Sequence, residues 1–159
     1  MRWNGSGWAQ SPVDVGTLFG LWGSGPSDVW AVGDAGAMVH WNGVVWKPIS
    51  SGTGSLLFGV WGSGPNDVWA VGAFGTIMRW NGAGWTLSAS GTTEWLTGVW
   101  GSGQNDVWVV GDEGTILRWN GSTWMPSSSG TRERLSAVWG SGPNDVWIAG
   151  DYGTVLRRR

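Results

Sequence analysis

The nine residues Trp61-Gly62-Ser63-Gly64-Pro65-Asn66-Asp67-Val68-Trp69 recur without a change at residues 139–147. Near copies begin at Trp22 and Trp100, and each copy starts 39 residues after the one before it. Self-similarity at a fixed period of this length is typical of proteins built from stacked structural repeats. The sequence therefore predicts four copies of one unit, with repeats that begin near Leu18, Leu57, Leu96 and Leu135.

Each repeat contains the pattern of four short strands. In the third copy, apolar runs cover 96–100, 107–110 and 115–119, and a weaker run covers 123–125. Gly, Asn and Asp separate these runs, and Asn120-Gly121 is a strong hairpin signal. Four strands joined by tight turns within about forty residues form one β-propeller blade. The predicted fold is all-β: a single domain, 1–159, with four-stranded antiparallel blades and no helix beyond a turn.

Tryptophan supports face-to-face packing of these blades. The chain has 17 tryptophans and 30 glycines in 159 residues, and four Trp positions recur from repeat to repeat, with Arg158 in one of them. The run at 107–110 is apolar at every position, which is typical of a sheet covered on both faces. Frequent glycine excludes helical repeats. Blades arranged around an axis cover one another in this way.

The two ends of the chain predict strand-exchange closure. Residues 2–8 match residues 79–85, so the segment 1–12 supplies a fourth strand, while the chain stops in the third strand of its last repeat. Sharing that blade between the ends removes exposed sheet edges. Four blades make a narrow ring with steep angles between sheets. We therefore expect a homodimer that forms one eight-bladed ring; the alternative is a four-bladed monomer closed on itself.

Residues 60–72 and their counterparts, of the form Val-Trp-Gly-Ser-Gly-Pro-Asn-Asp-Val-Trp-Ala-Val-Gly, resemble Trp-rich propeller repeats of large myxobacterial surface or secreted proteins. More distantly, residues 111–124 are similar to Asp-box propellers, which include photosystem II assembly factors and sialidases, with Asn120 in the place of the Asp. The resemblance implies the fold and no particular activity, because propellers host lectins, adaptors and enzymes. Tyr152, the only tyrosine, lies in a turn, so sialidase chemistry does not carry over.

Composition argues against several functions. The net charge is −2, which offers no electrostatic footprint for nucleic acid or an anionic membrane. The chain has no cysteine, and its one histidine, His40, stands where other copies have Arg. We expect no enzyme activity, cofactor or metal. No signal peptide is recognised in the chain, so the compartment is not indicated; the resemblance points to a secreted or cell-surface parent protein.

The recurring acidic residues leave two interpretations open. Asp28, Asp67, Asp106 and Asp145 form either a ring of carboxylates for a cation or a set of turn caps that accept backbone N–H groups, and we favour the caps. The Gly-Asp-x-Gly segments resemble a calcium loop, but Ala73 interrupts the series and calcium takes six or more oxygen ligands. Turn chemistry is again the preferred interpretation.

Internal variation indicates a candidate binding site. The constant connections share one rim of the predicted propeller, and the varied ones, including loops 51–56, 90–95 and 130–134, share the other. Varied loops on a rigid scaffold are typical of recognition surfaces, although they are equally consistent with a lack of constraint. Trp95 is the only tryptophan outside the repeat pattern. The predicted ligand-binding residues are Trp95, Phe74, Glu113, Arg132, Arg134 and Tyr152.

We therefore expect a non-catalytic scaffold that binds glycan or protein through this rim. The alternative is a purely structural repeat fragment, or an engineered half-propeller, with no ligand of its own.

Overall fold

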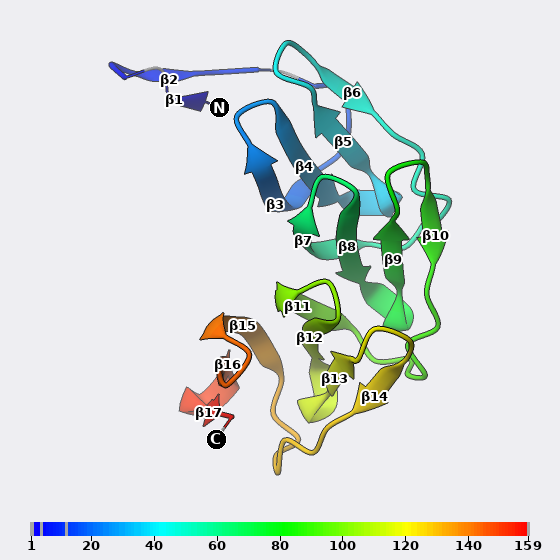
Figure 1. The fold of residues 1–159 in the computed structure, drawn as a ribbon, viewed down its shortest axis with the longest axis vertical. Coiled ribbons are helices and arrows are strands. Elements are labelled where there is room, and N and C mark those ends of the chain that lie inside the picture. Colours follow the sequence, from blue (N-terminus) through cyan, green and yellow to red (C-terminus); the bar gives the residue numbers. More distant parts are fainter. Residues whose placement is uncertain (1, 4, 12, 159) are drawn as a thin grey trace.

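The computed structural model describes residues 2–3, 5–11 and 13–158. The chain forms an open arc of four blades, and each blade is an antiparallel meander (Figure 1). Adjacent first strands contact one another along the inside of the arc. Blade 1 comprises β3 (Leu18–Gly25), β4 (Asp28–Gly33), β5 (Met38–Trp41) and β6 (Trp46–Pro48). Blade 2 comprises β7 (Leu57–Gly64), β8 (Asp67–Gly72), β9 (Ile77–Trp80) and β10 (Trp85–Leu87).

Blades 3 and 4 repeat the same order. Blade 3 comprises β11 (Leu96–Gly103), β12 (Asp106–Gly111), β13 (Ile116–Trp119) and β14 (Trp124–Pro126). Blade 4 has three strands, β15 (Leu135–Gly142), β16 (Asp145–Gly150) and β17 (Val155–Arg157). A separate hairpin precedes blade 1 and consists of β1 (Arg2–Trp3) and β2 (Trp8–Ala9).

The predicted all-β propeller class is confirmed. Between the second and third strands, each blade has one three-residue 3-10 turn, and these turns are η1 (Asp34–Gly36), η2 (Ala73–Gly75), η3 (Asp112–Gly114) and η4 (Asp151–Gly153). In the part of the chain that the structure describes, no helix is long and apolar enough to cross a membrane.

The first turn of each blade is tighter than the sequence suggested. The first strand of blade 3 was expected to end at Trp100, but β11 continues to Gly103, which pairs with Asp106. A register shift between Gly101 and Gly103 accommodates the extra residue as a β-bulge. The Ser102 hydroxyl also donates to the Asp106 carboxylate at 2.6 Å. The glycine-rich segment is therefore strand, and only two residues form the turn.

The predicted hairpin at Asn120-Gly121 is present, with a loop of four residues between the paired Trp119 and Trp124. The Asn120 Oδ1 accepts hydrogen bonds from the backbone N–H groups of Ser122 and Thr123, each at 3.0 Å. Asparagine in such a loop replaces backbone partners with its own side chain.

Apolar cores lie between blades, because each sheet is apolar on both faces. In the core between blades 2 and 3, Trp69 is completely buried and its ring centroid lies 5.1 Å from those of Trp119 and Trp124. The ring of Trp61 lies over Gly101, where a Cβ would collide with it. The same Trp-over-Gly contact joins Trp22 to Gly62 and Trp100 to Gly140.

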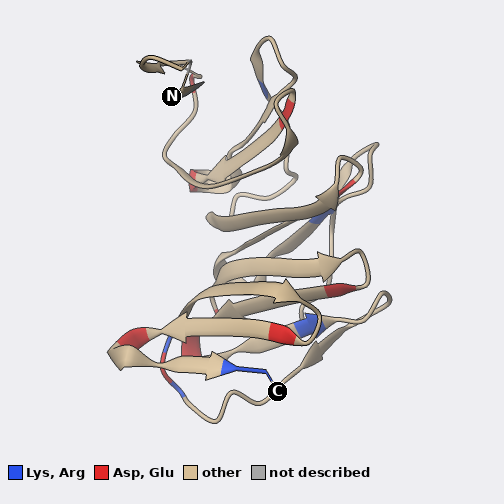
Figure 2. Cartoon of the chain, turned by 60° about the vertical axis from the view of Figure 1, so that its left-hand side comes forward, with Lys and Arg blue, Asp and Glu red and all other residues tan. Residues whose placement is uncertain are grey.

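The single chain is open at both ends. Within the described residues, β1 pairs with β2, and β17 is the outer strand of blade 4 (Figures 1 and 2). The four blades do not close into a ring in this structure. Strand exchange with a second copy stays a prediction. Residues 1, 4 and 12 of the predicted exchange segment 1–12, and Arg159, lie outside the described residues.

Candidate functional site

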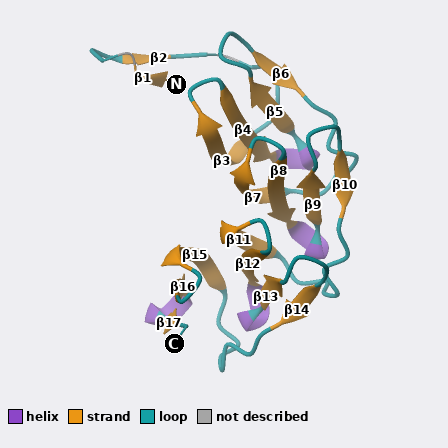
Figure 3. Cartoon of the chain, viewed as in Figure 1, coloured by secondary structure: helices purple, strands orange, loops and turns teal. Residues whose placement is uncertain are grey.

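The two rims of the arc carry different kinds of connection. The 3-10 turns all lie at the rim that we call the variable rim, together with the loops that lead from one blade to the next (Figure 3). The opposite rim, which we call the constant rim, holds the turns after each first and third strand. Because consecutive strands of a blade are antiparallel, these turns lie at the opposite end of the blade from the 3-10 turns.

At the constant rim, each blade contains one network of polar side chains. In blade 2, the Asp67 carboxylate accepts hydrogen bonds from the Ser63 hydroxyl at 2.6 Å and from the Arg79 Nε at 2.9 Å. The Arg79 guanidinium lies over Trp69 at 4.7 Å and over Trp119 of the next blade at 5.6 Å. Cation–π contacts of this kind hold neighbouring blades together.

These contacts correct the interpretation of the recurring aspartates as turn caps. The carboxylates of Asp28, Asp67, Asp106 and Asp145 accept hydrogen bonds from serine hydroxyls and from the Arg or His of the third strand. The hydrogen bonds from Ser141 and Arg157 hold the pKa of Asp145 below its usual value. Within the described residues, no group of three His, Cys, Asp or Glu side chains could hold a metal ion.

His40 replaces arginine in this network. Its Nε2 lies 2.6 Å from the Asp28 Oδ1, and its ring stacks on Trp30 with centroids 4.4 Å apart. The expected surface strand residue is thus half-buried, with a structural role that corresponds to that of Arg79 in blade 2.

At the variable rim, the loops between blades have a fixed backbone. The Ser90 hydroxyl donates to the Thr92 carbonyl at 3.2 Å, and the Thr92 hydroxyl accepts from the Glu94 N–H at 3.1 Å. The Gly75 N–H then donates to the Glu94 carbonyl at 2.8 Å, which ties the loop to η2. The same Ser-Gly-Thr sequence and contacts recur at 51–53 and 129–131. These loops are therefore not unconstrained, and only their last residues vary.

The tip of each 3-10 turn projects a side chain from a strained backbone. Ala35, Phe74, Glu113 and Tyr152 have φ between 49° and 56°, the left-handed region that non-glycine residues rarely adopt. Phe74 is 70% exposed and Tyr152 is 93% exposed. Strain held in this way is found most often at functional sites.

Aromatic side chains meet at the variable rim between blades 2 and 3. Trp95 lies with its ring centroid 5.5 Å from Phe58 and 6.1 Å from Phe74, at interplanar angles of 30° and 77°. We call these three residues the aromatic corner. Phe19 extends it, 5.7 Å from Phe58. Trp95, the tryptophan outside the repeat pattern, is 37% exposed. The aromatic corner thus presents three partly exposed rings on a rigid backbone.

The other predicted residues lie elsewhere. Arg134 pairs with Asp112 at 3.3 Å in the equivalent corner between blades 3 and 4, and Glu113 and Tyr152 are tips of their own turns. Among the described residues, neither predicted arginine makes a cation–π contact with Trp95. The structure therefore joins only Trp95 and Phe74 of the predicted set.

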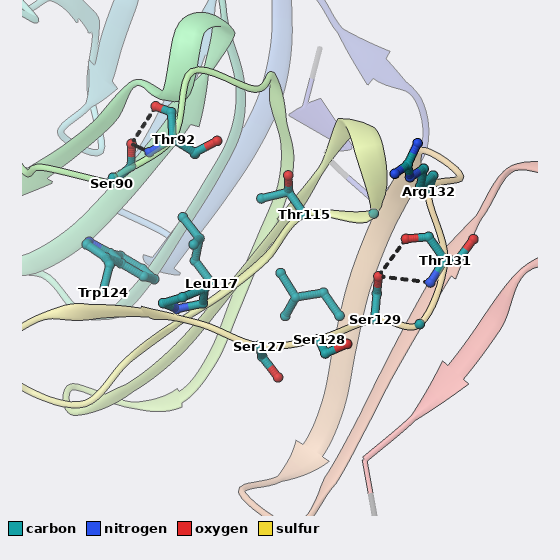
Figure 4. A pocket seen from close by; sticks show the side chains of 15 residues that line it. Ser90, Thr92, Thr115, Leu117, Trp124, Ser127, Ser128, Ser129, Thr131 and Arg132 are labelled. Atoms are coloured by element: carbon teal, nitrogen blue, oxygen red, sulfur yellow. Dashed lines mark hydrogen bonds between the residues drawn. The ribbon is translucent and has the colours of Figure 1, made fainter.

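Arg132 lines a groove of about 720 Å³ between the loops that flank blade 3 (Figure 4). The hydroxyls of Ser90 and Ser129 on this groove are hydrogen-bonded to their own loops (Figure 4). A smaller groove of about 350 Å³ lies at the equivalent place in blade 1. Blades 1 and 3 therefore share this groove, which is larger in blade 3.

Sequence reasoning missed Phe19 and Phe58, which belong to first strands and not to loops. The available signal was internal variation: the equivalent positions hold Thr97 and Ser136 in blades 3 and 4.

These features define a β-propeller repeat protein. The fold is similar to YCF48 from Cyanidioschyzon merolae, with a TM-score of 0.75 and 15% identity over 91% of this chain and 51% of that one. A structure of YCF48 bound to D1 peptide matches with a TM-score of 0.57 and 17% identity, over 97% of this chain and 68% of that one. This chain thus spans about half the length of the first of these structures.

The computationally designed Ika4 protein is also similar, with a TM-score of 0.75 and 18% identity over 95% of this chain and 97% of that one. At these identities the likeness shows the fold alone. No family model matches the sequence, and no curated protein matches it.

Proposed function

We propose that this chain is a non-catalytic propeller module that binds a protein segment through the aromatic corner of its variable rim. One observation carries the proposal: three aromatic rings, partly exposed, meet on a backbone that is already fixed by hydrogen bonds. Rigid aromatic anchors of this kind dominate the affinity of protein interfaces. A preorganised site also loses little conformational entropy on binding.

Protein is favoured over glycan by the geometry of the rings. Phe58 lies against Trp95 at a tilt of 30°, and Phe74 meets it nearly edge-on, so the three rings do not form one flat platform. An apolar side chain can pack against rings set at such angles, whereas a sugar stacks on an open, flat ring face. A similar structure, YCF48 bound to D1 peptide, is an instance of a peptide held by a protein of the same fold.

The non-catalytic character is supported by the side chains that could have carried chemistry. His40 is engaged with Asp28 and Trp30, and the recurring aspartates are engaged with serine and arginine. A general base needs free access to a substrate proton, and these groups are held in structural contacts.

A displayed peptide library and a glycan array, both probed with the intact chain, test the ligand class. We expect peptides with an apolar anchor to bind, and Trp95→Ala to abolish their selection while the chain stays folded. Trp100→Ala is the matched control, because Trp100 packs over Gly140 between blades and its loss destabilises the fold. Selection of glycans alone would contradict the protein assignment.

We also propose that two chains assemble into one eight-bladed ring by exchange of the N-terminal strand. Support comes from the open arc, the missing fourth strand of blade 4 and the separate β1–β2 hairpin. Light scattering should give twice the 16.9 kDa of one chain.

The competing proposal is a structural repeat fragment or engineered half-propeller without a ligand. The match to about half of YCF48 and the resemblance to bacterial Trp-rich surface repeats support it, and failure of every ligand screen would favour it.

A further inference from the structure

The interfaces between blades 1 and 2 and between blades 2 and 3 are built from the same two halves. One blade contributes two tryptophans, such as Trp61 and Trp69 of blade 2, and the next blade contributes a glycine and a Trp pair, such as Gly101 with Trp119 and Trp124. The two Trp rings of the first blade lie against the glycine and the Trp pair of the next blade. This full arrangement occurs between blades 1 and 2 and between blades 2 and 3. Between blades 3 and 4, Trp100 lies over Gly140, and Arg158 takes the place of the first Trp of the pair, 5.2 Å from the Trp108 ring. The contact has the same direction, from each blade to the next.

Blade 4 exposes the first half of this interface. Trp139 is the counterpart of Trp61, and Trp147 is the counterpart of Trp69. Trp139 is 60% exposed and Trp147 is 38% exposed, whereas Trp69 is completely buried. Val155 beside them is 63% exposed, although its counterpart Ile77 is buried. In each of the first three blades, the equivalent face is covered by the next blade. An exposed apolar face of this kind on blade 4 therefore indicates a missing neighbour.

Blade 1 exposes the second half. A hollow of about 360 Å³ lies on its open face, and it is lined by Leu21, Val29, Ala31, Trp41 and Trp46 among others. Their counterparts in blade 2 are Val60, Val68, Ala70, Trp80 and Trp85, which belong to or pack against the core that blade 1 covers. Leu21 is 70% exposed, whereas its counterpart Val60 is 8% exposed.

Gly23 occupies the glycine position of this half. A Cβ there would meet only its own blade, at the Asp28 carbonyl and Val29. The equivalent Gly62 has, in addition, the ring of Trp22 over it. The hollow thus has the lining and the glycine that receive a Trp pair elsewhere in the chain.

We infer that these two faces bind each other between two copies of this chain, with Trp139 over Gly23 of the partner and Trp147 against its Trp41 and Trp46. The inference rests on the two-copy ring proposed above, and adds which surfaces meet and which residues carry the affinity. A second copy fits because one chain carries both halves, at opposite ends of the arc (Figure 1). A directed contact made twice closes a two-fold symmetric ring.

The outer edge of blade 4 supports the same geometry. A hollow of about 450 Å³ beside β17 is lined by Trp108 and Ser127, among others. In blade 3, Trp124 packs against Trp69 and donates its Nε1–H to Ser88 at 3.2 Å. Trp108 and Ser127 are the counterparts of Trp69 and Ser88 one repeat later. Trp8, which is 68% exposed, holds the position of Trp124 in the hairpin that precedes blade 1 of the second copy.

Two substitutions on opposite halves test the interface. Leu21→Glu places a charge in the hollow, and Trp139→Ala removes the ring that enters it; both residues are exposed in the single chain, so the fold is retained. The matched control is Leu87→Glu, because Leu87 is 72% exposed on the outer strand of a blade that already has both neighbours. We expect each of the first two variants to raise the dissociation constant at least about a hundred-fold, and Leu87→Glu to leave it unchanged.

Mixing the two variants tests the direction of the contact. Each variant alone has two damaged interfaces, whereas a mixed pair has one interface with both changes and one with neither. Sedimentation of the mixture should therefore show dimers at concentrations where each variant alone is monomeric. A wild-type dimer that tolerates both substitutions would overturn this inference but not the assembly. A monomeric wild type would overturn both, and would leave the faces to a different partner.

Discussion

The interface between blades 2 and 3 and the open faces of blades 1 and 4 are formed by equivalent repeat positions, which are buried in the first and exposed in the second. Trp69 and Trp147 hold the same position in their repeats, yet Trp69 is completely buried and Trp147 is 38% exposed. The repeat therefore encodes an interface, and not merely a blade. Burial at any one position depends on whether a neighbour is present, which the sequence of a single repeat does not specify.

The largest expected effect is the difference in the free energy of unfolding between alanine substitutions at these two tryptophans. Trp69→Ala should lower the free energy of unfolding by about 3–5 kcal/mol, because it leaves a cavity against Trp119 and Trp124. Trp147→Ala should cost less than half of that in dilute solution. Urea denaturation at two protein concentrations measures both. If the second face is an interface, the cost of Trp147→Ala must rise with concentration; equal costs for both variants in dilute solution would refute the distinction.

The glycine positions should show a smaller difference of the same kind. Gly101→Ala places a Cβ against the Trp61 ring and the Asp106 carbonyl, whereas Gly23→Ala meets only atoms of its own blade. We expect Gly101→Ala to cost about 1–3 kcal/mol more than Gly23→Ala in the dilute chain. Gly103→Ala is the control, since nothing lies within 4 Å of its Cβ position. Thermal unfolding followed by tryptophan fluorescence would report the order of the three variants.

The strained tips should behave alike in covered and open blades, because their strain is local. Phe74→Gly should be more stable than Phe74→Ala by roughly 0.5–1 kcal/mol, since glycine adopts positive φ without a Cβ penalty. Tyr152→Gly should likewise be more stable than Tyr152→Ala, by a similar difference in the free energy of unfolding. Calorimetry of the four variants measures this. A gain at one blade only would show that the neighbouring blade, and not the turn, sets the strain.

The smallest effect concerns Asp145 at the open blade. Hydrogen bonds from Ser141 and Arg157 lower its pKa in the folded chain, so the folded state favours the carboxylate. Its contribution to stability is therefore present above the pKa of the unfolded chain and is lost as the pH falls through the folded pKa. NMR titration of the carboxyl carbon should show the lowered value, and Arg157→Ala should move it back toward the ordinary one.

Much of the fold can be predicted from the sequence because the same pattern of strands and turns recurs in four copies. The 39-residue period, the hairpin at Asn120 and the buried Trp positions follow from spacing and turn chemistry alone. The extension of β11 through Gly103 could not be predicted, because a bulge depends on cross-strand pairing and not on composition. The hydrogen bond from Ser63 to Asp67 was missed for the same reason: a carboxylate after a turn has several possible partners, and tertiary contacts decide among them.

The candidate site was predicted only in part. Trp95 and Phe74 stood out as departures from the repeat, and the structure brings them together. Phe58 was missed because it lies in a strand, where an aromatic residue signals nothing unusual. Arg134, also a predicted binding residue, lies in the next corner, where its Nε is 3.3 Å from the Asp112 Oδ1.

At the variable rim, the side chains exposed at the turn tips are not the groups whose hydrogen bonds fix the backbone. The hydrogen bonds of the three loops between blades use main-chain groups and an unvarying Ser-Gly-Thr, and the side chain at the turn tip takes no part in them. Alanine, phenylalanine, glutamate and tyrosine already share one tip position. A substitution at a tip position can therefore change the exposed surface one residue at a time, while the hydrogen bonds that hold the backbone stay the same.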